Sequence, residues 1–377
     1  MTPNTALLQE LNGHLETVVD IGASDLHLSS DCVPLARLHG GLLRLADRTL
    51  SAEDVAAFAR ALLEEKDWNT LAERKNIDFA YETLIRARPH RFRCNVYVQA
   101  LGLSIVMRMI PTEIQTPEEC GLPPSVVDMT NHANGLVLIT GSSGSGKTTT
   151  LAALLDHINR TRRVHIITIE DPIEYVHVPA MALIHQRQVG VDIDSFQSAL
   201  RGALREDPDV IMVGEMRDLA TTQLAITAAE TGHLVLSTMH TNSAAKTIDR
   251  LIDAFPVDQQ PQIRLMLSES LRGIVAQMLV PRVDSGRVLA CEVLHSVPAI
   301  ATMIRDRRSF QITSVLQTSR PLGMCSMDDA LCDLFQKGII SAYDARSRIL
   351  DPTLFERLQR EAAEQARQKA GVEQFRL

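Results

Sequence analysis

The sequence predicts a protein of two domains, in which an α/β domain built on a mostly parallel sheet follows a smaller α+β domain. Two observations carry this prediction. Short helical and strand patterns alternate over residues 1–110, which is typical of an α+β module with its own core. From residue 135, continuous apolar runs of strand length alternate with helical patterns, as expected for parallel strands buried on both faces. A chain of 377 residues is long enough for two or three domains.

The N-terminal region carries its own pattern of elements. Residues 7–19 and 55–63 have apolar side chains at helical spacing. Residues 24–28 alternate polar and apolar side chains, which predicts a half-buried strand. Residues 91–98 and 103–109 predict paired strands with arginines on one face. A neighbouring subunit could supply one of these arginines to a transition state, but surface salt bridges are the simpler explanation. These arginines are Arg91, Arg93 and Arg108.

Four prolines lie between residues 111 and 124. Proline fixes its own backbone and biases the preceding residue toward extended structure, so we expect an interdomain linker over 111–134. The α/β domain then covers 135–352, and from about residue 257 to 350 it is expected to be mostly helical. Residues 353–377 predict a charged helical tail, more simply a surface helix than a docking site. The expected parallel strands are 135–140, 164–169, 209–213 and 233–238.

The composition excludes several classes of function. A net charge of -8 argues against a general nucleic-acid binder, because such proteins normally present a basic surface. The N-terminus has no basic stretch followed by an apolar run, and no apolar stretch is long enough to span a bilayer, so direct membrane insertion is not expected. None of the six cysteines forms a C-x-x-C pair, which disfavours a structural zinc site and fits a reducing cytoplasm.

Residues 141–148 match the phosphate-loop pattern G-x-x-x-x-G-K-[ST] in full and follow an expected strand. Glycines let the backbone wrap phosphates closely, and the helix that follows directs its positive end at the same anion. Lys147 adds a positive charge near the β and γ phosphates, and the Thr148 hydroxyl is the expected Mg²⁺ ligand. ATP and Mg²⁺ are therefore predicted, with a ligand-free glycine-rich turn as the alternative. The predicted nucleotide-binding residues of this segment are Gly141, Ser142, Ser143, Gly144, Ser145, Gly146, Lys147, Thr148 and Thr149.

Acidic residues follow two of the other expected strands. Glu215 comes after an apolar strand, where a carboxylate can lie beside Mg²⁺, and we expect it to polarise the attacking water. The alternative is that Glu215 only pairs with a cation such as Arg217. Glu170 and Glu174 lie at a strand end where parallel sheets place their ligands, and a solvated loop is the alternative there.

His240 ends the strand expected from His233 to Met239, and a histidine at that point can contact the γ phosphate. His233 is at least as well explained as a hydrogen-bonded core histidine. The predicted catalytic residues are Glu215, Lys147, Glu174 and His240. The predicted metal ligands are Thr148, Glu170 and Glu215.

Several motifs in the same order give the chain a close resemblance to a known family. They are Gly22-Ala-Ser-Asp-Leu-His-Leu28, Arg91-Phe-Arg-Cys-Asn95, the phosphate loop, Thr168-Ile-Glu-Asp-Pro-Ile-Glu174, Ala203-Leu-Arg-Glu-Asp-Pro-Asp209, Val213-Gly-Glu-Met-Arg-Asp218, Ala228-Ala-Glu-Thr-Gly-His-Leu234 and Thr238-Met-His-Thr-Asn-Ser-Ala-Ala-Lys-Thr-Ile-Asp-Arg250. Together they resemble the type IV pilus retraction ATPase (PilT) family of the secretion ATPases, the GspE/PilT/VirB11-like superfamily, over residues 15 to 350 or so.

The resemblance implies a PAS-like N-terminal domain, a RecA-like ATPase domain and a homohexameric ring, with nucleotide between the two domains. It implies that Glu215 is the catalytic glutamate, that Arg93 contacts nucleotide, and that the protein is cytoplasmic. Peripheral attachment to the inner membrane would come through a pilus platform protein, and a second retraction ATPase is a further candidate partner. The work implied is pilus disassembly, which powers twitching motility.

One stretch departs from the family pattern. Retraction ATPases carry Ala-Ile-Arg-Asn-Leu-Ile-Arg-Glu near the C-terminus, where this chain has Ala299-Ile-Ala-Thr-Met-Ile-Arg-Asp306. An accessory, PilU-like role is therefore an open alternative. A pilus assembly or type II secretion ATPase is disfavoured, because the tetracysteine metal site of that group is absent. A nucleotide-binding regulator with little hydrolysis and a DNA translocase are the alternatives from other classes.

Overall fold

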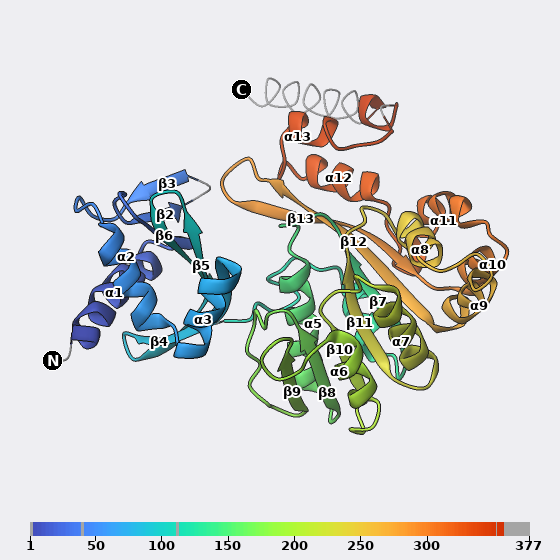
Figure 1. The fold of residues 1–377 in the computed structure, drawn as a ribbon. Helices are drawn as coiled ribbons and strands as arrows, with labels where there is room; N and C mark the ends of the chain where they lie inside the picture. Colours follow the sequence, from blue (N-terminus) through green and yellow to red (C-terminus); the bar gives the residue numbers. More distant parts are fainter. Residues whose placement is uncertain (1–2, 39–40, 111–112, 352, 358–377) are drawn as a thin grey trace, which may run out of the picture. The chain divides into compact units, whose positions relative to one another are not determined.

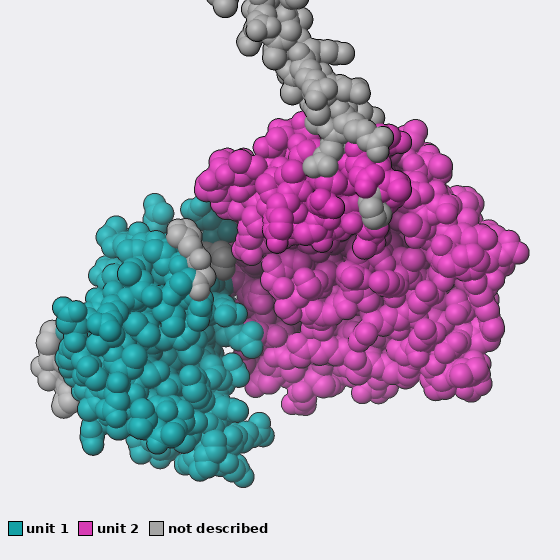
Figure 2. Space-filling model, turned by 90° about the horizontal axis from the view of Figure 1, so that it is seen from above, with its two compact units in different colours: residues 1–113 teal, residues 114–377 magenta. Residues whose placement is uncertain are grey.

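The structure, a computed structural model, describes residues 3–38, 41–110, 113–351 and 353–357. It divides into two compact units, residues 1–113 and residues 114–377, called the N-terminal and C-terminal units below (Figures 1 and 2). Residues 353–357 are helical, and the rest of the predicted tail lies outside the described residues. Within the described ranges, none of the helices has the length and apolar surface required to cross a bilayer.

The N-terminal unit is a six-stranded antiparallel sheet packed against helices, with strand order β3-β2-β1-β6-β5-β4. Its helices and strands confirm the predicted α+β class, whereas the PAS-like assignment stays a prediction. Leu11 and Leu15 of the first helix and Phe58 of the second pack with strand residues in one core. The elements are α1 (Pro3–Asp20), β1 (Asp25–Ser29), β2 (Leu35–Leu38), β3 (Gly41–Arg44), α2 (Ala52–Leu62), α3 (Glu65–Arg74), β4 (Asn76–Ile85), β5 (Arg88–Gln99) and β6 (Gly102–Ile110).

The middle of strand β5 alternates between core and outer face, as predicted. Phe92, Cys94 and Val96 are buried, so Arg91 and Arg93 lie on the opposite face.

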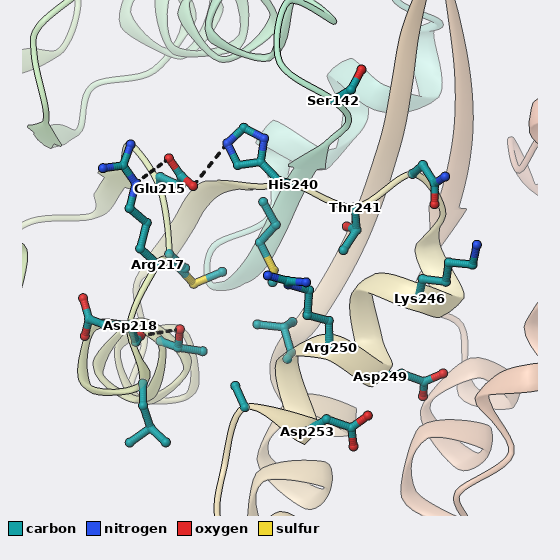
Figure 3. Close-up of a pocket in the computed structure, with 17 residues that line it drawn as sticks. Ser142, Glu215, Arg217, Asp218, His240, Thr241, Lys246, Asp249, Arg250 and Asp253 are labelled. Carbon is teal, nitrogen blue, oxygen red and sulfur yellow. Dashed lines mark hydrogen bonds and ion pairs between the residues drawn. The ribbon is translucent and has the colours of Figure 1, made fainter.

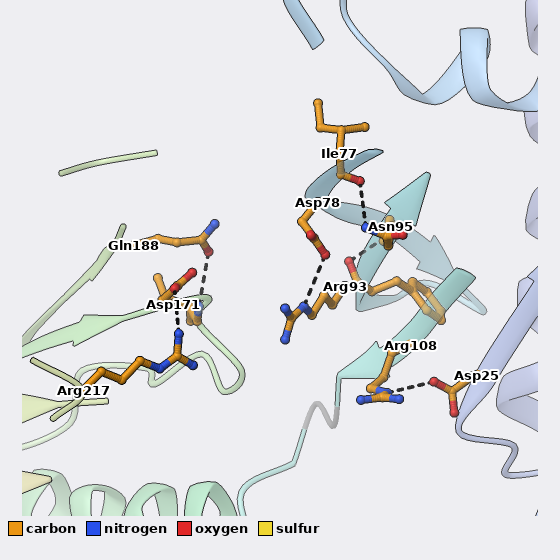
Figure 4. A network of polar contacts seen from close by, with 12 residues as sticks. Asp25, Ile77, Asp78, Arg93, Asn95, Arg108, Asp171, Gln188 and Arg217 are labelled. Atoms are coloured by element: carbon orange, nitrogen blue, oxygen red, sulfur yellow. Dashed lines mark hydrogen bonds and ion pairs between the residues drawn. The ribbon is translucent and has the colours of Figure 1, made fainter. Parts of the chain in front are cut away.

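Arg93 lies directly across from Arg108 of β6. Like charges opposite each other destabilise a sheet, but each arginine has an acidic partner. Arg93 lies 3.8 Å from Asp78, and Arg108 lies 2.8 Å from the buried carboxylate of Asp25 (Figure 4). The arginines of this face are thus engaged in ion pairs, as the simpler explanation expected.

The C-terminal unit is built on a seven-stranded sheet with order β13-β12-β7-β11-β10-β8-β9. All neighbouring strands are parallel except β12 and β13. The four predicted parallel strands are present, each within one residue of its expected bounds. The strands are β7 (Gly135–Thr140), β8 (His165–Glu170), β9 (Leu183–Gln188), β10 (Val210–Val213), β11 (Leu234–Met239), β12 (Leu271–Pro281) and β13 (Arg287–His295).

Helices cover both faces of this sheet (Figure 1). Leu136 and Leu138 of β7 belong to one buried cluster, whereas Val137 and Ile139 belong to another on the opposite face. This confirms the α/β class and explains why β7 is a continuous apolar run. The helices are α4 (Pro124–Asp128), α5 (Lys147–Thr161), α6 (Phe196–Ala203), α7 (Leu219–Glu230), α8 (Ala244–Asp253), α9 (Gln260–Ser270), α10 (Pro298–Arg305), α11 (Ile312–Thr318), α12 (Met327–Gln336) and α13 (Ala342–Arg346), with short 3₁₀ turns at Met129–Asn131, Ser309–Gln311 and Arg320–Leu322.

The prediction that residues 257–350 are mostly helical is wrong for two segments. Residues 271–281 and 287–295 form an antiparallel pair, and β12 continues the parallel sheet beside β7. A continuous apolar run buried on both faces has no period that separates strand from helix, which explains the error.

Strand β13 places a buried carboxylate, Glu292, between two helix starts. Its Oε1 accepts the backbone N–H of Ala244 at 2.7 Å, in the first turn of α8. It also accepts the backbone N–H of Met327, the first residue of α12. Burial raises the pKa of Glu292 above its ordinary value, and these two hydrogen bonds only partly oppose that rise.

We predict that Glu292→Gln flattens the pH dependence of stability. The raised pKa means that the folded protein holds this proton more tightly than the unfolded chain, where the pKa is near 4.5. The stabilisation that Glu292 contributes is therefore complete below pH 4.5. It is lost as the pH rises through the higher pKa of the folded state.

Urea unfolding at several pH values between 4.5 and 8 measures the effect. The free energy of unfolding should fall more with pH in the wild type than in the variant. Only the slopes are compared, because the amide has one acceptor oxygen and so also changes stability for reasons other than charge. Parallel slopes would contradict the prediction.

Candidate active site

The candidate site lies at the carboxyl edge of the parallel sheet. Thr140 of β7 is in register with Met239 of β11, and Val213 of β10 lies between Ser237 and Ile169. Four adjacent strands therefore end together, and the predicted residues Gly141, Glu170, Glu215 and His240 lie at or just beyond those ends. Open α/β sheets bind their ligands at this edge.

The phosphate loop has the backbone of an anion cradle. Helix α5 begins at Lys147, and its N-cap Gly146 has φ 89°, in the left-handed region. Gly141 has φ 152°, and a Cβ there would lie 2.4 Å from the carbonyl oxygen of Gln277. Gly144 also has positive φ, but open space surrounds its Cα. Glycine is thus required at Gly141 both by conformation and by the close approach of β12.

Lys147 is turned into its own loop. Its Nζ donates hydrogen bonds to the carbonyl oxygens of Gly141 at 2.9 Å and Ser142 at 3.0 Å. The side chain is buried, and burial lowers the pKa of Lys147, while the charges of Glu215 and Glu174 oppose that shift. Neutral carbonyls are weaker acceptors for an ammonium than phosphate oxygens, so the loop is ready to exchange them for an anion.

Glu215 lies between a histidine and an arginine. Its Oε1 is 3.2 Å from Nε2 of His240, and its Oε2 accepts a hydrogen bond from Nε of Arg217 at 2.9 Å (Figure 3). Arg217 also lies 3.9 Å from Asp171 (Figure 4). The pairing with Arg217 that was the alternative for Glu215 is therefore present, together with a contact to His240 that the sequence did not predict.

A groove of about 1070 Å³ opens beside this carboxylate. Ser142 of the phosphate loop, Glu215 and His240 line one part of it, and Lys246 and Arg250 of α8 line another (Figure 3). His233 has a different place, because it precedes β11 and its Nδ1 contacts the carbonyl oxygen of Ala228 at 3.0 Å. The structure therefore separates His240, which lies at the candidate site, from His233, which does not.

Glu170 is buried and hydrogen-bonded through one of its two carboxylate oxygens. Its Oε1 accepts hydrogen bonds from Thr168 at 2.6 Å and from Gln186 at 3.0 Å. Burial raises its pKa, and the hydrogen bonds oppose that rise. Its assignment as a metal ligand stays a prediction. Glu174 is close enough to Lys147 and Glu170 to influence the pKa of both.

Mg²⁺ bound to nucleotide normally takes one or two protein oxygens and fills its other positions with phosphate and water. Thr148 in the first turn of α5 and the part-buried carboxylate of Glu215 supply donors of that chemistry. No cluster of three acidic, histidine or cysteine side chains suited to a metal occurs in the described part of the chain. The residues thus fit a cation brought in with a nucleotide.

Two contacts to the phosphate loop were missed from the sequence. The hydroxyl of Tyr175 lies 3.0 Å from that of Thr149, and the side-chain amide of Gln277 donates to the carbonyl of Ser145 at 2.8 Å. Tyr175 directly follows the acidic segment 170–174, so its position in the sequence could have indicated this contact. Gln277 is separated from the loop by more than a hundred residues and lies on a strand taken for a helix, so no local signal marked it.

Comparison with known proteins now decides the family. Residues 3–368 match the type II/IV secretion system proteins. The chain belongs to that family. The type IV pilus retraction ATPase PilT of Pseudomonas aeruginosa is 46% identical over 334 residues, covering 89% of this chain and 96% of PilT. The type IV pilus ATPase PilU of the same organism is 38% identical over 333 residues, covering 88% and 86%.

A crystal structure of the pilus retraction motor PilT with bound ADP matches with a TM-score of 0.85 at 42% identity, and covers 91% of this chain and 98% of that chain. The chain is thus a member of the PilT branch of the secretion ATPases. This confirms the resemblance inferred from its motifs and the predicted α/β fold class.

We predict that Gly141→Ala destabilises the protein far more than Gly144→Ala. A Cβ at Gly144 meets only left-handed backbone strain, about 1–2 kcal/mol, whereas one at Gly141 also overlaps the β12 backbone and should cost about 3 kcal/mol or more. Urea unfolding of the two variants measures the difference. Equal losses would show that the close approach of β12 does not constrain the loop.

Proposed function

We propose that this protein is an ATP-hydrolysing hexameric motor that powers type IV pilus retraction, and through it pilus disassembly and twitching motility. One observation carries the proposal. A complete phosphate loop, Glu215 and His240 meet at one sheet edge, in a chain that is 46% identical to a pilus retraction ATPase over 89% of its length. A structure of the related motor holds ADP, which supports a nucleotide as ligand here.

The chemistry follows from the residues of this edge. Lys147 leaves the carbonyls of Gly141 and Ser142 and binds the β and γ phosphates, which are far stronger acceptors. Thr148 and Glu215 would hold Mg²⁺ together with the nucleotide, and the cation would supply positive charge to neutralise the phosphates. Glu215 orients and polarises the attacking water. His240 contacts the γ phosphate, so its contact with Glu215 can report whether that phosphate is present.

In the assembled ring, Arg93 contacts nucleotide and adds positive charge to the transition state. Its partner Asp78 is 3.8 Å away, and both side chains are largely exposed, so this ion pair is weak enough to exchange. We place the motor in the cytoplasm, attached to the inner membrane through a pilus platform protein. The net charge of -8 does not indicate a basic surface. This supports a protein, rather than a nucleic acid, as the partner on which the motor acts.

An accessory, PilU-like role is the second candidate. Helix α10 covers the stretch that departs from the retraction-ATPase pattern, and PilU of Pseudomonas aeruginosa is 38% identical. In that case the protein hydrolyses ATP but supports a second retraction ATPase.

We predict that Lys147→Ala and Glu215→Gln separate binding from chemistry. Removing the lysine deletes the charge that holds the phosphates, so nucleotide binding and turnover should both be lost. Glu215→Gln keeps the cradle but removes the carboxylate, and the ATPase rate should fall about 100-fold or more while ATP still binds. Fluorescent-nucleotide binding and phosphate release measure the two effects. Wild-type hydrolysis by the glutamine variant would remove Glu215 from the mechanism.

Deletion of the gene tests the direction of work. Loss of a retraction motor should leave cells with abundant surface pili and no twitching motility, whereas loss of an assembly motor should leave cells without pili. An accessory motor predicts piliated cells with reduced twitching. The Glu215→Gln variant serves as the matched control, because it separates loss of activity from loss of the protein. Cells without pili would overturn the retraction proposal.

A further inference from the structure

A buried glutamine lies against the phosphate loop from the side of the sheet. Gln277 of β12 is 3% exposed, and it comes directly after Ala276, which is in register with Thr140, the last residue of β7. Its Nε2 donates a hydrogen bond to the backbone carbonyl of Ser145 at 2.8 Å. A Cβ on Gly146 would lie 3.3 Å from the same Nε2. The Gln277 side chain therefore contacts the loop backbone on both sides of the Ser145–Gly146 peptide bond.

The position of this hydrogen bond fixes the direction of a neighbouring donor. The Ser145–Gly146 peptide is trans, because Asp171–Pro172 is the only cis bond among the described residues. In a trans peptide the C=O and N–H groups point in opposite directions. Holding the Ser145 carbonyl toward Gln277 thus turns the Gly146 N–H away from β12. Within the described part of the chain this N–H has no backbone acceptor.

The polar groups around this contact are left incompletely bonded. The Oε1 of Gln277, the Oγ of Ser145 and the Oγ1 of Thr140 are buried without a partner among the described residues. Burying an amide with one of its groups unpaired is unfavourable, and unpaired buried groups in native proteins call for a functional explanation. An apolar side chain of similar size would satisfy the packing here, so the amide is explained by its bond to the loop.

We propose that Gln277 is a positioning residue for the nucleotide. It holds the Ser145–Gly146 peptide so that the Gly146 N–H faces the phosphates, before any ligand arrives. The ligand is the diphosphate part common to ADP and ATP, since a loop donor of this kind contacts that part in both. This inference deepens the function proposed above and rests on it.

The test compares two glutamine-to-leucine substitutions. In Gln277→Leu the side chain keeps its size but cannot hold the carbonyl. The matched control is Gln260→Leu, because Gln260 Nε2 also donates to a backbone carbonyl, that of Phe255 at 3.1 Å, at the start of α9 and outside the phosphate loop. Binding of fluorescent ADP and ATP analogues is measured in the full-length protein, together with kcat and KM.

Gln277→Leu should weaken ADP and ATP by a similar factor of about ten, the value of one lost hydrogen bond, and should raise KM more than it lowers kcat. Gln260→Leu should leave both affinities unchanged. Wild-type affinity in Gln277→Leu would overturn the inference, as would an equal loss in the control. Failure of the wild-type protein to bind either nucleotide would instead remove the proposed function.

A second variant keeps the inference testable if the leucine variant does not fold. In Gln277→Glu the ionised carboxylate cannot donate to the Ser145 carbonyl, whereas the protonated acid can. Its nucleotide affinity, relative to the wild type at each pH, should therefore recover as pH falls. A ratio that does not change with pH would overturn the inference.

Discussion

The architecture of the site depends on a buried ammonium that no carboxylate of the described residues contacts directly. Lys147 lies at the positive end of α5, where a further cation is unfavourable. Only two backbone carbonyls contact its Nζ among the described residues, and the nearest acidic influence comes from Glu215 and Glu174. Burying the charge of Lys147 costs free energy. A bound anion offsets that cost when it replaces the two carbonyl oxygens at Nζ. The loop glycines, the helix start and the edge position of the acids all serve that one requirement.

Much of this arrangement could be predicted from the sequence, because the information is local. The spacing of residues 141–148 fixes both the loop and the helix after it. The four apolar runs from Gly135 to Met239 are short, bounded and followed by polar residues, so they predict parallel strands with ligands at their ends. The alternation in β5 likewise predicts which face carries Arg91 and Arg93.

The rest could not be predicted, because it depends on contacts between distant segments. The sequence of β12 predicts a helix as readily as a strand. Gln277 reaches the phosphate loop only because β12 pairs with β7. The same hairpin brings Glu292 to the start of α8, and no local pattern records that pairing. The contact between Glu215 and His240 joins the ends of two strands, and so requires the assembled sheet.

The two hydrogen bonds of Glu292 also bear on how helices of the C-terminal unit are anchored. This single carboxylate ties the first turns of α8 and α12, helices far apart in the chain. Helix α8 begins four residues after His240, so its first turn lies close in sequence to the candidate site. Because Glu292 is buried and belongs to a strand, it anchors this first turn to the sheet.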